Sequence, residues 1–278
     1  MSVLLFTVLI GLGSFVAGFL GSLTGLGGGV VVVPLLALVF HVDMRYAIGA
    51  SLVSVIATSS GAAAAYVREG YSNMRIGMFL EIATTIGAIA GAMIAVHVST
   101  ATIAVVFGFV LLYSAYLSIR TQPPHPVIKE HDVLARVLHL DSSYPTAQGM
   151  EDYTVHRIPL GFGLMFGAGT LSGLLGIGSG AVKVLAMDQA MRIPFKVSTT
   201  TSNFMIGVTA AASAGIYLAR GYIDPGIAMP VVLGAGAGSM LGARVLVNAR
   251  TKSLRAVFSV VIIILGIEMI FNGFTGRI

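Results

Sequence analysis

The chain has 278 residues, of which 56% are hydrophobic and 10% carry a charge, whereas soluble domains carry about 25% charged residues. This composition excludes an ordinary soluble globular protein, and the absence of cysteine excludes a disulfide framework and a thiolate metal site. The net charge of +5 does not indicate a nucleic-acid partner, because the basic residues cluster between the apolar stretches, as membrane topology requires.

Ten apolar segments are expected to form helices, in two groups of five. A helix of about 20 apolar residues is long enough to cross a bilayer. We therefore predict an all-α polytopic membrane protein that lies in the lipid bilayer of the cell membrane. In chain order the expected helices are 3–23, 29–40, 46–67, 76–96 and 101–119, then 158–174, 180–191, 197–218, 227–247 and 254–272.

The chain matches itself when it is shifted by 151 positions, without a gap over residues 15–93. The glycine-rich run 25–29 then falls on 176–180, and Ser51 falls on Ser202. Internal repeats of this kind are found in many transporters. We divide the chain into a first membrane repeat (1–119), a connector (120–157) and a second membrane repeat (158–278).

The second segment of each repeat, at 29–40 and 180–191, is too short to span. Twelve helical residues extend about 18 Å, which is well below the roughly 30 Å of a hydrocarbon core. The glycine runs that precede these segments are therefore expected deep in the membrane. The first two segments of each repeat form either a re-entrant hairpin or two tilted spans, and the sequence is compatible with both.

The positions of the basic residues favour an odd number of crossings in each repeat, so that the second repeat is inverted. Arg45, Arg220 and Arg277 then share one face, and the other twelve basic residues apart from Lys183 share the opposite face. Parallel repeats give eight against seven. Because Lys and Arg are enriched on the cytoplasmic side, we predict that both termini lie outside and that residues 120–157 are cytoplasmic.

A glycine-rich run opens the short segment of each repeat and can form an anion site. The first N–H groups of a helix have no intrahelical partner and lie at the positive end of its dipole. Inverted repeats direct two such helix starts toward the membrane centre. Alternatively, the glycines only allow helices to pack closely. The candidate ligands are Gly27, Gly28, Gly29, Gly178, Ser179 and Gly180.

Lys183, three residues after Gly180, is the one basic residue that cannot be assigned to a loop. A charge in a bilayer is costly and usually marks a pathway. We therefore expect Lys183 to compensate the charge of a bound anion, and the alternative is a lysine that reaches the membrane surface. Its counterpart in the first repeat is Val32. Glu81, in the fourth segment, is the candidate for a coupling proton or for a pair with Lys183.

Small polar side chains occupy the third segment of each repeat. They can donate hydrogen bonds to an oxyanion, or they can join neighbouring helices. The candidates are Ser51, Thr58, Ser202, Asn203 and Thr209. Ser51 and Ser202 are equivalent in the two repeats, so we expect both to face a common central cavity.

The four histidines between residues 121 and 157 do not have the spacing of a metal site. We expect them to lie in a solvated loop, and we expect no metal and no other cofactor. A homo-oligomer is compatible with the sequence.

The glycine runs and the third segment resemble a known family. Gly21–Gly29 (GSLTGLGGG), followed by valines and Pro34, resembles the first-repeat motif of the TauE/SafE-type sulfite exporters. Residues 173–180 (GLLGIGSG) resemble the repeat of that motif, and residues 196–203 (KVSTTTSN) also resemble a family segment. The resemblance covers essentially the whole chain. It implies transport of small sulfur-containing anions such as sulfite or sulfonates, often as export.

The leading interpretation is a secondary transporter of such an anion, with proton coupling inferred from Glu81. No Walker motif is present, so the chain does not itself use ATP. An anion channel, or an uptake permease for another small anion, is the alternative. An enzyme is disfavoured because the spans offer Ser and Thr without His for a nucleophile–base pair.

Overall fold

The computed structural model describes residues 3–24, 28–68, 72–119, 132–146, 149–248 and 251–277. The first repeat forms α1 (Val3–Thr24), α2 (Gly29–Pro34), the π-helix η1 (Leu35–Val39), α3 (Met44–Arg68), α4 (Met74–His97) and α5 (Thr100–Ile119). The second forms α7 (Ile158–Leu175), α8 (Gly180–Leu185), the π-helix η2 (Ala186–Ala190), α9 (Phe195–Ala219), α10 (Pro225–Asn248) and α11 (Thr251–Thr275). All ten predicted helices are present, with bounds that differ by no more than three residues.

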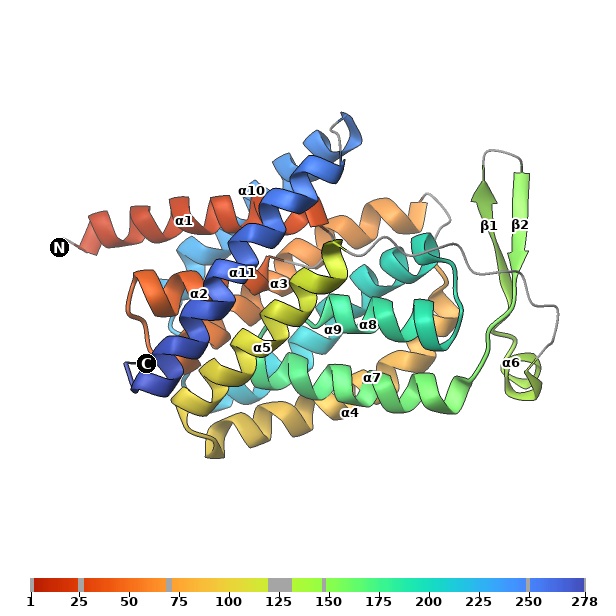
Figure 1. Ribbon diagram of the computed structural model, residues 1–278, viewed down its shortest axis with the longest axis horizontal. Coiled ribbons are helices and arrows are strands. Elements are labelled where there is room, and N and C mark those ends of the chain that lie inside the picture. Colours follow the sequence, from red (N-terminus) through yellow and green to blue (C-terminus); the bar gives the residue numbers. More distant parts are fainter. Residues whose placement is uncertain are drawn as a thin grey trace.

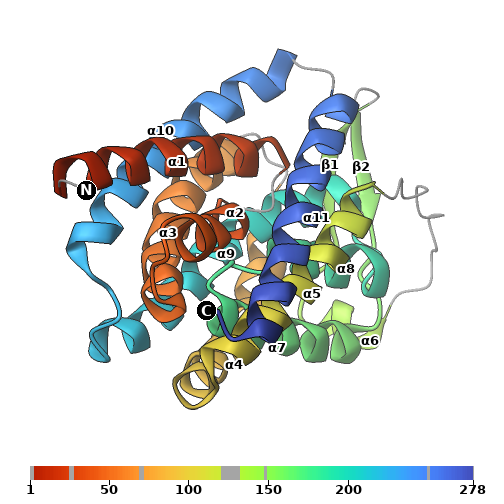
Figure 2. The same cartoon turned by 60° about the vertical axis from the view of Figure 1, so that its left-hand side comes forward.

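The fold is that of a polytopic membrane protein, as predicted. Within the described residues, α1, α4, α7, α9 and α10 are long and apolar enough to cross a bilayer. Large apolar side chains such as Leu12, Met93 and Phe271 are more than half exposed, which suits a surface that faces lipid. The helices pack mainly as four pairs, α1 with α10, α4 with α7, α5 with α11 and α3 with α9 (Figures 1 and 2).

Close glycine contacts hold the pairs α1–α10 and α4–α7 together, and the 151-residue shift places one pair on the other. A methyl group on Gly18 of α1 would lie 2.2 Å from the carbonyl oxygen of Ala235 in α10. At the equivalent place, a methyl group on Gly169 of α7 would lie 2.1 Å from the carbonyl oxygen of Thr84 in α4. The two repeats therefore contact each other in the same way from both sides, which is the contact pattern of a twofold relation.

The equivalent helices α5 and α11 run in opposite directions. Gly108 of α5 lies against Gly266 of α11, and further along the pair Ala101 lies against Gly273. Residue numbers thus fall along one helix as they rise along the other. A twofold axis that exchanges two antiparallel helices is perpendicular to them.

Each short segment returns to the end of the molecule where its repeat begins. The rings of Phe6 in α1 and Phe40 after η1 pack edge to face at 5.9 Å, and Gly28 lies against Gly18, about four helical turns into α1. In the second repeat, the backbone N–H of His156 donates to the carbonyl of Met191 at 3.1 Å. Each short segment thus runs back toward the start of its repeat, which both arrangements compatible with the sequence include.

Both short segments turn from α-helix into π-helix at equivalent residues. Pro34 precedes the first π-segment, but Leu185 stands at the matching position in the second. The π geometry therefore does not depend on proline. Both segments end on a non-glycine residue in the left-handed region, His41 at φ 53° and Arg192 at φ 57°.

The connector includes a β-hairpin that we did not predict, formed by β1 (Ser142–Thr146) and β2 (Gly149–Tyr153), beside the short helix α6 (Val133–Val137). These elements lie at one end of the molecule, and the two chain ends lie at the other (Figure 1). Asn73, the N-cap of α4, donates through Nδ2 to the carbonyl of Leu140 at 3.2 Å and to the phenol of Tyr153 at 2.7 Å. Burial raises the pKa of Tyr153, so the phenol stays neutral at this anchor.

The close contact at Gly169 gives a stability prediction. Gly169→Ala would force α7 and α4 apart, and overpacking of this kind costs about 1–3 kcal/mol. We expect a lower midpoint of thermal unfolding for the purified protein in detergent. The matched control is Gly167→Ala on the same helix, where a methyl group meets no atom within 4 Å and should leave the midpoint unchanged or raise it. Equal midpoints for the two variants would contradict the contact.

Candidate functional site

The second glycine run lies between α3 and α9 at the interface of the repeats. The hydroxyl of Ser51 in α3 donates to the carbonyl of Gly176 at 2.8 Å, and that of Ser202 in α9 donates to the carbonyl of Gly180 at 3.3 Å. A side chain on Gly178 would meet Ile206 at 2.7 Å. The two predicted serines are thus brought to one segment of backbone, one from each repeat.

This run has a strained backbone, and its Ser179 differs from the equivalent residue Gly28, which has a φ of −64°. Gly176 and Gly178 have φ angles of +70° and +69°, which suit glycine. Ser179 also lies in the left-handed region, at φ 47°, although serine rarely adopts it. Its side chain is buried, and its Oγ has no hydrogen-bond partner among the described residues. A strained residue with an unpaired buried hydroxyl is typical of a functional position.

Lys183 lies one turn further along α8 and is completely buried. Its ammonium donates to Thr209 Oγ1 of α9 at 2.5 Å, and Thr209 Oγ1 lies 2.6 Å from Glu81 Oε1 of α4. Glu81 is itself 8% exposed. The structure therefore joins Lys183, Thr209 and Glu81, three residues that we singled out separately, into one buried cluster.

The hydrogen bonds of the cluster leave part of its capacity unused. An ammonium has three donors, and the described part of the chain gives Lys183 one acceptor, Thr209. Glu81 Oε1 also accepts from Thr85 at 3.2 Å, but Glu81 Oε2 is buried without a partner among the described residues. A buried cation and a buried carboxylate oxygen thus both have unused hydrogen-bonding capacity.

Each of the two opposite charges lowers the energetic cost of burying the other. Two opposite unit charges roughly 5 Å apart attract by about 3 kcal/mol at an effective dielectric constant of about 20. Either charge alone would be buried without compensation, which costs several kcal/mol. Lys183 is therefore not a lysine that reaches the membrane surface. Its partner is supplied by the opposite repeat.

The equivalent place in the first repeat carries no charge. Under the 151-residue shift, Lys183 corresponds to Val32, Thr209 to Thr58 and Glu81 to Val232. Thr58 bonds to the carbonyl of Val55 in its own helix at 3.3 Å. The scaffold is repeated, but the charged chemistry is present once.

The remaining predicted residues lie around this centre. Gly29 has no room for a side chain, because a methyl group would lie 2.7 Å from Ser51 Oγ. Gly28 precedes α2, Asn203 is buried in α9, and Gly27 lies outside the described residues. We missed Thr84 and Thr85, although their positions three and four residues after Glu81 place them on the same helix face.

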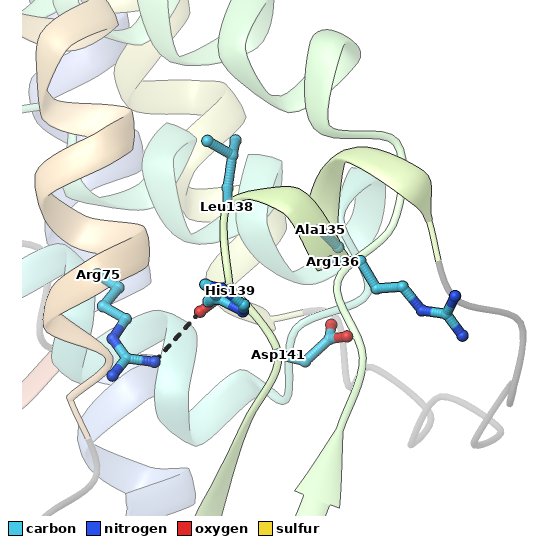
Figure 3. A pocket seen from close by; sticks show the side chains of 6 residues that line it. All are labelled: Arg75, Ala135, Arg136, Leu138, His139 and Asp141. Atoms are coloured by element: carbon cyan, nitrogen blue, oxygen red, sulfur yellow. Dashed lines mark hydrogen bonds between the residues drawn. The ribbon is translucent and has the colours of Figure 1, made fainter.

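A pocket of about 830 Å³ lies at the connector end, between α4 and α6 (Figure 3). Arg75 lines it and donates to the carbonyl of His139 at 3.4 Å. Arg136 and Asp141 also line it, so its charges are mixed. It contains no residue of the buried cluster, and we place the functional site at the cluster.

Comparison with known proteins gives one consistent result. The profile of the sulfite exporter TauE/SafE family matches residues 10–269. The chain is 30% identical over 277 residues to the probable membrane transporter protein YunE of Bacillus subtilis (strain 168), covering 96% of this chain and 98% of that protein. It is 26% identical over 231 residues to the probable membrane transporter protein YdhB of the same organism, covering 83% and 86%. No solved structure matches the chain.

The bridging hydroxyl of Thr209 gives a second prediction. Thr209→Val keeps the shape and removes the group that joins Lys183 to Glu81, and hydrogen bonds to charged groups contribute about 1.5–3 kcal/mol each. We expect the midpoint of thermal unfolding to fall, and Thr209→Ser to restore most of it. Thr199→Val on the same helix is the control, since that hydroxyl bonds to the carbonyl of Phe195 in its own helix and not to a charged group among the described residues. A loss no larger than that of the control would show that Thr209 does not hold the charges together.

Proposed function

The chain belongs to the sulfite exporter TauE/SafE family and is a multi-pass membrane transporter, and we propose that it carries a small sulfur-containing anion, such as sulfite or a sulfonate, across the cytoplasmic membrane. The observation that carries the proposal is the fully buried ammonium of Lys183, with one acceptor among the described residues. A buried cation with unused donors suits an oxyanion, because each donor can bind an oxygen.

The proposed site lies at the interface of the repeats. Lys183 and Thr209 come from the second repeat and Glu81 from the first. Ser179 adds a buried hydroxyl one turn before Lys183, and the backbone around Gly178 and Gly180 adds N–H groups. Transporters with internal repeats bind substrate at such an interface. We include Ser51, Ser202 and Asn203 as surrounding polar groups and assign Thr58 and Gly27–Gly29 to the uncharged half.

We propose that transport is secondary and proton-coupled, with export as the direction that the family description implies. Glu81 is the titratable partner of the substrate-binding cation, which is the arrangement needed for a coupled proton. We propose no catalytic reaction for the chain. A channel would contain the same cation but would not couple anion flux to protons.

We also propose inverted repeats, with the termini outside and the connector in the cytoplasm. The twofold pattern of glycine contacts and the opposite directions of α5 and α11 support the inversion. Arg45 donates to the carbonyl of Val98 at 3.3 Å and lies over the ring of Tyr222, so it belongs to the end opposite the connector. Arg75 instead contacts the connector. This distribution supports the predicted excess of positive charge on the connector side.

Cysteine labelling tests the sidedness. The chain has no cysteine, so Ser142→Cys in β1 and Thr275→Cys at the end of α11 each give one reactive site, and both positions are exposed. With a membrane-impermeant maleimide on intact cells, we expect labelling of Thr275→Cys, and labelling of Ser142→Cys only after permeabilisation. The reverse pattern would contradict the proposed orientation.

Removal of the buried cation tests the site. Lys183→Met keeps the bulk of the apolar stem and loses a charged hydrogen bond worth about 1.5–3 kcal/mol, so affinity for sulfite should fall roughly ten- to a hundredfold. The measurements are binding to the purified protein and uptake into proteoliposomes. Arg220→Met, at the exposed end of α9, is the control for loss of a positive charge. Unchanged binding and transport in Lys183→Met, with normal protein level, would refute the assignment.

A further inference from the structure

We propose that the Glu81 carboxylate and the transported anion are alternative partners of Lys183, so that each anion moves together with one proton carried on Glu81. The proposal rests on the proposed function and specifies how that site couples its two ions. It assigns Thr209 as the residue that keeps its hydrogen bond to Lys183 in both states and redirects its own proton when Glu81 is protonated.

Without a bound anion, the charges of the cluster are balanced when Glu81 is ionised. Thr209 has a single hydroxyl proton, and its Oγ1 lies 2.6 Å from Glu81 Oε1 and 2.8 Å from the carbonyl of Met205. With Glu81 ionised, Thr209 donates to the carboxylate and accepts from Lys183. The cluster is then neutral, and the attraction of Glu81 holds the ammonium. An incoming anion would have to compete with that attraction.

Protonation of Glu81 reverses this arrangement. The carboxyl becomes neutral, so Lys183 is left as an uncompensated buried cation, which is unfavourable without a new anion. A proton on Oε2 also creates a donor at an atom that has no partner among the described residues. The O–H of Glu81 and the two free N–H groups of Lys183 then offer three donors. Thr209 turns its proton to the carbonyl of Met205 at 2.8 Å and continues to accept from Lys183.

Nothing else in the described surroundings compensates a second negative charge. From α4, Glu81 is faced by Thr84 and Thr85, and from α9 by Thr209. The charged group that acts on Glu81 is Lys183 of α8, and the one that acts on Lys183 is Glu81. The other described buried carboxylate, Asp188, adds negative charge and cannot help an anion to bind. An ionised Glu81 and a bound anion would therefore leave the cluster with a net negative charge.

The proton and the anion consequently bind and leave on the same side of the membrane. The proton enters Glu81 from the aqueous phase that supplies the anion, and it returns to the phase that receives the anion. Because the equivalent place has Val32 and Val232 instead of charges, the ratio is one proton to one anion. Transport of a monovalent anion is then electroneutral. Export proceeds when the internal excess of the anion outweighs the inward pH gradient.

Methanesulfonate is the probe for the first measurement, since its charge is constant between pH 5 and 9 (sulfite changes charge in this range). Binding to the full-length purified protein should weaken as pH rises, approaching about tenfold per pH unit on the alkaline side, as linkage between one proton and one anion requires. Glu81→Gln should bind at all pH values with little change. Glu268→Gln, at an exposed position of α11, should keep the parent profile. A flat profile in the parent, or a steep one in Glu81→Gln, overturns the proposal.

The second measurement needs no variant and therefore does not depend on the folding of one. Parent protein in proteoliposomes, driven by a methanesulfonate gradient, should move one proton in the direction of each anion, as recorded by an internal pH dye. No proton movement, or movement in the opposite direction, overturns the coupling while anion transport itself stands. If nitrate is carried with a proton and sulfur anions are not, the proposed cargo is wrong and the coupling is supported. If neither methanesulfonate nor nitrate binds, both proposals fail.

Discussion

The structure depends on one energetically unfavourable feature, a lysine that is completely buried. Lys183 is completely buried in a helix of six residues, and its charge is compensated by Glu81 through the hydroxyl of Thr209. Because Glu81 belongs to the other repeat, this compensation exists only when α4, α8 and α9 meet. Assembly of the two repeats and formation of the charged site are therefore the same event. Separating the repeats would leave two uncompensated charges in an apolar environment.

The scaffold around that cluster is symmetric, whereas its chemistry is not. The contact of Gly18 with Ala235 repeats that of Gly169 with Thr84, and both short segments change to π-helix at equivalent residues. A symmetric scaffold allows the same packing to be used twice with the same small residues. Two charged copies would double the cost of burial and place two cations close to one path. The uncharged copy, with Val32 and Val232, avoids that cost, and it confines the proposed ion binding to one place.

Much of this fold could be predicted from the sequence, because length and polarity determine which segments can lie in a membrane. All ten helices follow from apolar runs and their polar ends, and the repeat follows from aligned glycines. The contacts that hold the short segments, such as Phe6 with Phe40, could not be predicted, because they join residues far apart in the chain. The bridging role of Thr209 could not be predicted from the sequence either. Lys183, Glu81 and Thr209 were each visible as polar residues in apolar surroundings, but only the crossing of α4 and α9 makes them neighbours. The hairpin β1–β2 was missed because its strands are short and polar and contact only the connector end.

The glycine contacts also limit how far the backbone that carries Glu81 can move relative to α7. Gly169 of α7 approaches the backbone of Thr84, less than one turn from Glu81, so closely that no side chain would fit between the helices. Gly173 and Gly91 extend the same contact along the pair α4–α7. The backbone that carries Glu81 is therefore held at a fixed distance from its neighbour, and packed interfaces of this kind resist continuous deformation. In the proposed coupling, a proton on the carboxylate frees the ammonium for an anion without any movement of this backbone. Tight packing at small residues and a titratable group at the centre are thus two parts of one mechanism.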